Sequence, residues 1–323
     1  MNRVPHIVFL DRATIPDYIQ LKPFTFKHTL DVYDKTPENQ VAERIQQADI
    51  VITNKVKISN ESLAQAASLK LIAVSATGTN VVDIKACESK GCVVTNIRNY
   101  AMNSVPEHAL ALILALRRSI LPYHASVRAG DWQKSGQFCY FDYPISDLAD
   151  STLGIFGSGV LGSSLARLGR ALGMKTVFAS RKGQAPKNET YRPFNEVLET
   201  SDVLSLHLPL TEETRHMISD QEFGRMKSSA LLINTARGGL VDEEALVRAL
   251  KGKKIAGAGF DVASTEPMPN NHPFMELMDY PNFILTPHVA WASKGAIQTL
   301  ADQLVNNINA FMQGEIRNQV LPE

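Results

Sequence analysis

The sequence predicts an α/β protein with two parallel β-sheets, and three observations carry this prediction. The chain has 323 residues, more than one hydrophobic core usually serves, so we expect two domains. Short β-rich runs alternate with segments of helical composition, a pattern typical of parallel sheets covered by helices. A glycine-rich turn at residues 157–162 directly follows one β-rich run and precedes a helical segment.

The N-terminal part of the chain is expected to form the first sheet. Its β-rich runs lie at residues 6–10, 50–53, 71–75 and 92–95, with helical segments such as 37–48 and 60–67 between them. A longer helix is predicted from Ser104 to about Arg118. Ser104 can act as its N-cap, Pro106 lacks an amide that would be unpaired there, and Glu107 can complete a capping box. We interpret this helix as a connector between the domains.

The second sheet is expected after a loop rich in aromatic and polar residues, 131–147. Its six β-rich runs are residues 152–156, 176–179, 203–207, 230–234, 255–260 and 283–286. Six strands interleaved with helices indicate a doubly wound nucleotide-binding sheet of the Rossmann type. One further helix is predicted at residues 294–312, and Gly314 would end it.

Composition favours a small-molecule partner. The 33 basic and 33 acidic residues balance, and no basic cluster stands out, so neither nucleic acid nor a membrane surface is an expected partner. The first apolar run is too short for a secretory signal, and the longest, 109–116, is far below membrane-spanning length. Cys87, Cys92 and Cys139 match no zinc ligand set, so we expect no metal and predict free thiols in a cytoplasmic protein.

The glycine-rich turn is the predicted site for a dinucleotide cofactor. It lies between a strand and a helix that runs to Gly173, which is the context this motif requires. Gly157 permits a tight turn, Gly159 lets the backbone approach a pyrophosphate, and Gly162 allows the helix to pack closely on the strand. The helix N-terminus adds amide donors. The residues expected at the pyrophosphate are Gly157, Ser158, Gly159, Val160, Leu161 and Gly162.

The end of the next strand bears on which dinucleotide is bound. An NAD enzyme normally carries Asp or Glu there to hold the ribose hydroxyls, but this chain has Ser180, Arg181 and Lys182. Without a carboxylate a 2′-phosphate is not repelled, and the two cations can pair with it. We therefore favour NADP(H). NAD(H) stays open, because Arg181 and Lys182 can also form a solvated turn.

Three polar residues follow later strands of the same predicted sheet: Arg237, Glu266 and His288. The carboxyl ends of parallel strands meet at one edge, so all three are expected to face one crevice. A guanidinium suits a substrate carboxylate, and an imidazole can give and regain a proton near neutral pH. A glutamate beside it would favour the charged imidazolium. Taken singly, each residue also fits a turn, a surface loop or a structural histidine.

These motifs together resemble one family. The glycine-rich turn, residues 234–242, Asp261 with Glu266 and Pro267, and residues 287–290 are similar to those of the D-isomer-specific 2-hydroxyacid dehydrogenases, and most of all to the glycerate dehydrogenase or hydroxypyruvate reductase branch. The resemblance covers essentially the whole chain. It implies an oxidoreductase that transfers a hydride between NAD(P)H and a small 2-keto acid, hydroxypyruvate or glyoxylate, giving D-glycerate or glycolate.

The resemblance also implies roles for single residues. Arg237 would bind the substrate carboxylate, His288 would be the acid/base and Glu266 would tune it, while Asp261 would hold the nicotinamide carboxamide. Asn54 and Trp291 look like those of the hydroxypyruvate and glyoxylate branch. The further residues expected at the substrate are Thr77, Gly78 and Thr79, and those expected at the cofactor are His207, Pro209, Thr214, Thr235 and Ala236.

The resemblance implies a discontinuous domain organisation. Residues 1–102 and 290–323 would form a smaller flavodoxin-like substrate domain, and residues 103–289 the NAD(P)-binding domain, through which family members typically form homodimers. Two alternatives stay open: a cofactor-sensing binding module, as in corepressors of this fold, and a dehydrogenase for another 2-keto acid, such as a short-form phosphoglycerate dehydrogenase.

Overall fold

The computed structural model describes residues 3–322. The chain divides into two compact units, one containing the residues up to Tyr100 and from Ser293 onward, the other Ala101–Ala292. These limits lie a few residues from the predicted domain boundaries of 102/103 and 289/290. The first unit is discontinuous in sequence because its last helix belongs to the C-terminal segment.

The first unit contains a five-stranded, fully parallel sheet in the order β2-β1-β3-β4-β5. This is the flavodoxin-like strand order 2-1-3-4-5, as the fold class predicted. One strand, β2, was not predicted. It lies at the sheet edge with all of its residues exposed, so it lacks the apolar run that marks a buried strand. The strands are β1 (His6–Phe9), β2 (Thr29–Val32), β3 (Ile50–Thr53), β4 (Leu71–Val74) and β5 (Val93–Thr95).

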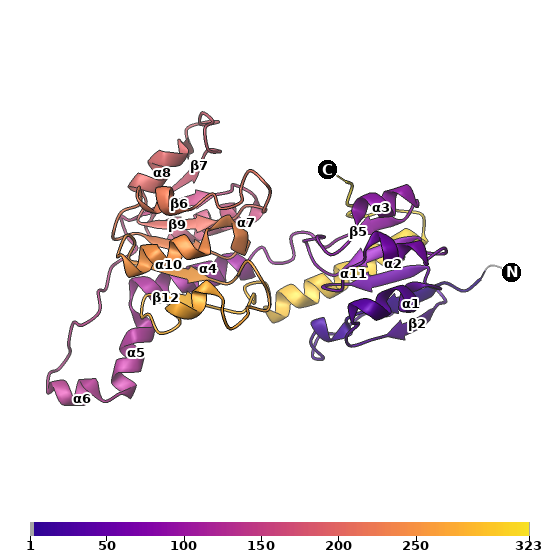
Figure 1. Cartoon of the computed structure of the whole chain (residues 1–323), viewed down its shortest axis with the longest axis horizontal. Helices are drawn as coiled ribbons and strands as arrows, with labels where there is room; N and C mark the ends of the chain where they lie inside the picture. The colour runs from indigo at the N-terminus through magenta and orange to yellow at the C-terminus, as the bar shows by residue number, and fades with distance from the viewer. Residues whose placement is uncertain (1–2, 323) are drawn as a thin grey trace. The chain divides into compact units, whose positions relative to one another are not determined.

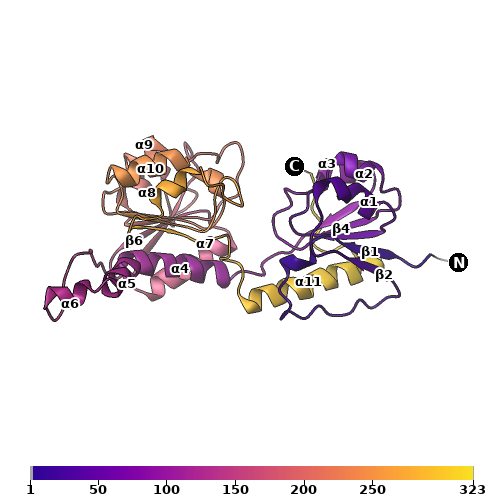
Figure 2. The same cartoon turned by 60° about the horizontal axis from the view of Figure 1, so that its bottom comes forward.

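Helices cover both faces of this sheet (Figure 2). The short helices α1 (Val41–Ile45), α2 (Asn60–Ala64) and α3 (Ile84–Ser89) lie on one face. The other face is covered by α11 (Lys294–Met312), which has the predicted bounds and begins with Ser293 as its N-cap. Its buried apolar side chains, such as Leu300 and Leu304, recur at helical spacing, which is why the sequence predicted it well.

The second unit contains a seven-stranded parallel sheet in the order β12-β11-β10-β9-β6-β7-β8. Counted within the sheet, this is the 3-2-1-4-5-6 order of a Rossmann sheet with one strand added. The six predicted strands are present, and the seventh, β8, is only two residues long. The strands are β6 (Thr152–Phe156), β7 (Lys175–Ala179), β8 (Tyr191–Arg192), β9 (Val203–Leu206), β10 (Leu231–Asn234), β11 (Gly257–Phe260) and β12 (Phe283–Leu285).

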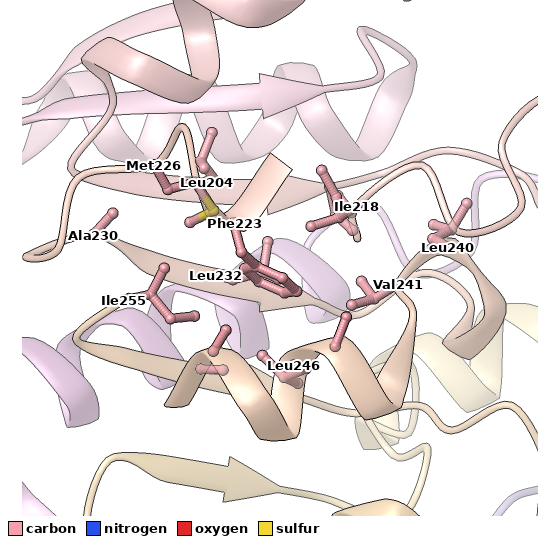
Figure 3. Packing of buried hydrophobic residues seen from close by; sticks show 14 of the residues in the cluster. Leu204, Ile218, Phe223, Met226, Ala230, Leu232, Leu240, Val241, Leu246 and Ile255 are labelled. Atoms are coloured by element: carbon pink, nitrogen blue, oxygen red, sulfur yellow. The ribbon is translucent and has the colours of Figure 1, made fainter. Parts of the chain in front are cut away.

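Two helical layers enclose the second sheet (Figure 2). The helices α4 (Ser104–Arg117) and α7 (Val160–Ala171) lie on one face, and α8 (Phe194–Thr200), α9 (Asp220–Phe223) and α10 (Glu243–Lys251) lie on the other. Between the sheet and α10 is a buried apolar cluster in which Phe223 packs near Leu232 and Leu246 (Figure 3). This core fixes the strands whose ends carry the predicted site residues.

Two local expectations need correction. Ser104 was expected to cap the connector helix, but Asn103 is the N-cap residue of α4 and makes no side-chain capping bond. The Ser104 hydroxyl instead donates to the carbonyl of Ala290, because the helix start is packed against that loop and is buried.

The predicted loop 131–147 begins with a short helix, α6 (Asp131–Ser135), which follows α5 (Ile120–Arg128), and both extend away from the sheet (Figure 1).

Within residues 3–322, no helix combines the length and apolarity needed to cross a membrane. The same part of the chain holds no group of three or more His, Cys, Asp or Glu residues that is arranged to bind a metal ion.

Candidate active site

The predicted cofactor and catalytic residues of the second unit lie at one edge of its sheet. All strands are parallel, and the register pairs Phe156 with Leu206, Asn234 with Phe260, and Phe260 with Leu285. The loops that follow these strands therefore begin side by side. The strand order reverses between β6 and β9, and such a switch point is where open α/β sheets bind ligands.

The glycine-rich turn lies at this switch point. Gly157 has φ of 104°, and a Cβ there would lie 2.2 Å from the carbonyl oxygen of His207. A Cβ on Gly162 would lie 2.0 Å from the carbonyl oxygen of Gly157, so α7 packs too closely for any side chain. Gly159 differs, because nothing lies within 4 Å of its Cβ position. Two of the glycines are thus required by the fold, and the third leaves the backbone open at the start of α7.

The residues after β7 show which predicted cations are already engaged. Lys182 donates from Nζ to Oε1 of Glu222 at 2.7 Å. Burial alone raises the pKa of Glu222, but the hydrogen bonds from Lys182 and Ser219 outweigh it and lower that pKa. The Arg181 guanidinium is exposed and bonds to none of the described residues. Ser180 is buried, and its hydroxyl has no hydrogen-bond partner among them.

His207, Pro209 and Thr214 line the other side of the switch point, after β9. His207 forms a hydrogen bond of 2.9 Å through Nε2 with the Ser205 hydroxyl, and burial lowers its pKa to about 4. The side chain is therefore neutral near pH 7 and brings no positive charge to this edge. Thr214 donates from its hydroxyl to the carbonyl of Pro209 at 2.8 Å, which closes a tight turn.

A buried asparagine shapes the loop that carries Arg237. Asn234 donates to the carbonyl of Arg237 at 2.8 Å and accepts from the amide of Ala236 at 3.1 Å. Arg237 itself is half-buried, and its Nη1 donates to the carbonyl of Ala236 at 2.7 Å. Its other guanidinium nitrogens bond to none of the described residues. The buried Thr235 hydroxyl likewise has no partner among them.

Glu266 and His288 form the hydrogen-bonded pair that the sequence predicted. Oε2 of Glu266 lies 2.7 Å from Nδ1 of His288, and Oε1 accepts from the amide of Ala263 at 3.0 Å. Both carboxylate oxygens are therefore oriented by the chain. Because Nδ1 faces Glu266, Nε2 is the imidazole nitrogen that is left for a ligand. The indole of Trp291 donates to the carbonyl of His288 at 2.9 Å.

The loops of Arg237 and Glu266 pack directly against each other. A Cβ on Gly238 would lie 2.0 Å from the carbonyl carbon of Ala263 and 2.3 Å from the amide nitrogen of Ser264. Only glycine allows the two backbones to come this close. The segments that bear the guanidinium, the carboxylate and the imidazole are thus neighbours at one sheet edge.

Asp261 holds the loop that carries His288. Its side chain is 1% exposed, and its carboxylate accepts from the amides of Val289 at 2.9 Å and Ala290 at 2.8 Å and from the hydroxyl of Thr286. This bracing was not predicted, although an aspartate directly after a strand was a visible signal. The role toward the nicotinamide carboxamide that the resemblance implied stays a prediction.

The first unit has a comparable arrangement at its own switch point, between β1 and β3. The buried carboxylate of Asp11 accepts from the amides of Asn54, Lys55 and Val56. Burial raises the pKa of Asp11, and the three amides partly counteract that rise. Asp11 was missed at the sequence level. Of the predicted substrate residues, Asn54 is buried here, and Thr77, Gly78 and Thr79 follow the next strand, β4.

Comparison with known proteins places this geometry in a family. Residues 110–290 match the family described as "D-isomer specific 2-hydroxyacid dehydrogenase, NAD binding domain". The glycerate dehydrogenase of Methylorubrum extorquens is 52% identical over 316 residues, which cover 97% of this chain and 98% of that protein. The chain belongs to the D-isomer-specific 2-hydroxyacid dehydrogenase family. The resemblance predicted from the sequence motifs is thereby confirmed.

Two solved structures of related proteins share the fold. A D-lactate dehydrogenase of Aquifex aeolicus, complexed with NAD and lactic acid, matches with a TM-score of 0.81 and 29% identity, covering 98% of this chain and 99% of that one. An acyclic imino acid reductase in complex with NADPH and D-Arg matches with a TM-score of 0.83 and 27% identity, covering 98% and 100%. Relatives of this fold thus bind either nicotinamide dinucleotide.

The second unit fits a dinucleotide on structural grounds of its own. Backbone amides at the start of the 12-residue helix α7 lie beside the open position at Gly159, as a pyrophosphate requires. The buried hydroxyls of Ser180 and Thr235 lack partners among the described residues and lie after strands at the same edge. The second unit is therefore the NAD(P)-binding domain of this family.

Proposed function

We propose that this protein reduces a small 2-keto acid, hydroxypyruvate or glyoxylate, to D-glycerate or glycolate with NAD(P)H. The observation that carries the proposal is the 2.7 Å hydrogen bond between Glu266 and Nδ1 of His288, at the sheet edge that also bears Arg237. Reduction of a keto group needs a proton donor for the carbonyl oxygen and a cation for the carboxylate, and these residue types supply both. The similarity to a glycerate dehydrogenase supports the choice of substrate.

In this proposal His288 donates the proton. Glu266 accepts from Nδ1 and thereby orients the ring, so Nε2 is the nitrogen that donates a proton to the carbonyl oxygen. After the transfer the neutral imidazole keeps its proton on Nδ1, where it is hydrogen-bonded to Glu266. This fixes the tautomer for the reverse reaction, in which Nε2 accepts the proton. The amide of Ala263 holds the other carboxylate oxygen, so the pair does not need to reorganise during turnover.

Arg237 binds the substrate carboxylate in the same scheme. One arm of its guanidinium is anchored on the carbonyl of Ala236, which limits the side-chain entropy lost on binding. The remaining N–H groups are directed to the carboxylate in a bidentate pair. NAD(P)H, when bound along the glycine-rich turn, supplies the hydride that the carbonyl carbon receives. We also propose as substrate-binding residues Asn54, Trp291 and the backbone of Thr77, Gly78 and Thr79.

The function is tested by supplying the purified protein with a panel of short 2-keto acids and following oxidation of NADPH and of NADH. We expect the largest kcat/KM with hydroxypyruvate or glyoxylate. The matched variant is His288→Asn, because His288 has φ of 54° and asparagine tolerates this left-handed conformation. It should lose about 100-fold or more in kcat and retain cofactor affinity. Tight cofactor binding without turnover of any keto acid would favour a cofactor-sensing module instead.

We also propose that NADP(H) is the preferred cofactor. The three residues directly after β7, Ser180, Arg181 and Lys182, include no carboxylate. The exposed Arg181 is available for a 2′-phosphate, whereas Lys182 is already paired with Glu222. Replacing Arg181 by Asp should raise the ratio of NADH to NADPH efficiency by about tenfold or more, since a charge-assisted contact becomes a repulsion. The control is Lys187→Asp, which makes the same charge change on the same exposed loop. Equal ratios in the two variants would refute the assignment.

We further propose a homodimer formed by the NAD(P)-binding unit. Residues 119–147, which include α5 and α6, extend from this unit and expose large apolar side chains, with Phe138 at 93% and Phe141 at 84%. Exposed aromatic groups of this size mark interaction surfaces. Light scattering after size exclusion should give twice the chain mass for the native protein and a shift toward one chain for Phe138→Ser/Phe141→Ser. A native monomer would contradict the proposal.

A further inference from the structure

A buried polar cluster lies beneath the loop that carries Glu266. Glu243, in the first turn of α10, and His272 have side chains that are only 7% and 4% exposed, and Oε2 of Glu243 lies 2.9 Å from Nε2 of His272. Nothing in the mechanism above uses these two residues. Buried ionisable groups are costly unless their hydrogen bonds have a use, so the cluster needs an explanation.

The partners of Glu243 lie on the loop that carries Glu266. Its Oε1 accepts from the amide of Ser264 at 2.7 Å, and its Oε2 accepts from the Ser264 hydroxyl. Ser264 is therefore held through its backbone and its side chain at once. The amide of the preceding residue, Ala263, donates to Glu266 itself at 3.0 Å. Two consecutive amides thus connect Glu243 to the carboxylate that faces His288.

The proton on His272 is fixed by its surroundings. The amide of Phe274 donates to Nδ1 of His272 at 3.2 Å, so Nδ1 must be an acceptor. The hydrogen then resides on Nε2, which donates to Glu243. Glu243 accepts three hydrogen bonds, two of them from Ser264, and its orientation is fully determined. On the other side of the loop, Gly238 packs against the backbone of Ala263 and Ser264.

This arrangement differs from an ordinary surface loop. Residues 264–267 are exposed, and such segments are usually mobile. Here the exposed segment is fixed between the backbone of Gly238 and the buried carboxylate of Glu243. A catalytic group on a loop needs such support, because a displacement of about 1 Å can reduce a rate 100-fold.

We propose that Glu243, Ser264 and His272 form a positioning network that sets the Glu266 carboxylate against Nδ1 of His288. Glu243 does not touch the substrate; it acts through Glu266. The proposal rests on the function proposed above, since its kinetic readout is the reduction of a 2-keto acid.

The test is a double-mutant cycle on kcat with Glu243→Gln and Glu266→Gln. Glutamine at position 243 would place an N–H donor against the hydroxyl of Ser264 or against the N–H of Nε2 of His272. The imidazole cannot adapt by moving its proton to Nδ1, because the amide of Phe274 already donates to that nitrogen. We expect Glu243→Gln to lower kcat about tenfold with KM for the keto acid nearly unchanged. In the Glu266→Gln background the same change should have almost no further effect. An equal factor in both backgrounds, or an unchanged kcat, would overturn the proposal.

Matched variants separate positioning from folding. Glu244→Gln makes the same chemical change at the adjacent position, where the side chain is 76% exposed, and should leave kcat unchanged. Should Glu243→Gln fail to fold, Ser264→Ala removes only the hydroxyl contacts, to Glu243 and, at 3.5 Å, to Nε2 of His272, and keeps the backbone hydrogen bond to Glu243. It should lower kcat about threefold, and again only when Glu266 is present. A loss that persists without Glu266 contradicts the proposal.

A second readout does not depend on turnover. Imidazole ¹⁵N resonances should report the Nε2–H tautomer for His272 in the native protein and a shifted Nδ1 resonance for His288 in Glu243→Gln. A protein that reduces no keto acid but shows these resonances would refute the proposed function and leave the network standing. An unperturbed His288 resonance in Glu243→Gln would refute the network even in an active enzyme.

Discussion

Replacing Asp261 by Asn tests whether this buried carboxylate holds the His288 loop in place. Asp261 is 1% exposed and accepts three hydrogen bonds, from the amides of Val289 and Ala290 and from the hydroxyl of Thr286. An amide keeps the shape but turns one acceptor into a donor. At least one buried N–H then loses its partner, at a cost of about 1–3 kcal/mol, and the remaining bonds lose their charge assistance.

The expected loss of unfolding free energy is about 3 kcal/mol. For a unit of this size, that corresponds to a fall in Tm of about 10 °C, which differential scanning calorimetry of the native protein and the variant measures. The kcat for the keto acid should fall as well, because the backbone next to His288 is no longer braced. Asp279→Asn is the control, since Asp279 is exposed and its change should stay within about 0.5 kcal/mol. A Tm for Asp261→Asn equal to that of the control would refute the reasoning.

Two further predictions concern the cofactor edge. Gly162→Ala should reduce stability by about 1–3 kcal/mol, because its Cβ would meet the carbonyl of Gly157 at 2.0 Å, whereas Gly159→Ala should fold normally and weaken NADPH binding in a fluorescence titration. Equal stability of the two variants would contradict this reading. In the folded protein, burial lowers the pKa of His207 to about 4. Below about pH 6.5 the unfolded chain therefore binds a proton at His207 that the folded chain does not bind. The free energy of unfolding consequently falls as pH drops from 6.5 toward 4. Between pH 7 and pH 5 the native protein should therefore lose about 2 kcal/mol more than His207→Gln in urea unfolding, and identical losses would show that His207 is not the group responsible.

The fold was predictable where burial leaves a regular pattern. Buried parallel strands such as β3 and β4 are continuous apolar runs, and α11 shows its apolar face at helical spacing. The strand β2 was not predictable, because its exposed residues carry no such pattern and only its pairing with β1 defines it. The prediction that Ser104 caps a helix was wrong for a related reason. Its hydroxyl donates to the carbonyl of Ala290, a contact that depends on tertiary packing and not on the local sequence.

The candidate active site was predictable where a chemically suitable residue comes shortly after a predicted strand. Arg237, Glu266 and His288 come after strands that the structure makes neighbours, so a sheet topology was enough to bring their loops together. The supporting groups were not predictable in the same way. Asp11 and Glu243 accept hydrogen bonds from backbone amides of segments that are distant in the sequence. No local sequence pattern indicates which amides will donate to them.

The most direct test of the central claim is kcat for keto-acid reduction in the native protein, in Glu266→Gln, in His288→Asn and in the double variant. In the proposed mechanism the Glu266 carboxylate, 2.7 Å from Nδ1, orients the imidazole of His288 so that Nε2 donates the proton. Glu266→Gln should therefore lower kcat about tenfold or more with KM for the keto acid nearly unchanged, and it should have almost no further effect once His288 is replaced. An equal factor in both backgrounds would show that Glu266 does not act through His288, and the proposed mechanism would be wrong.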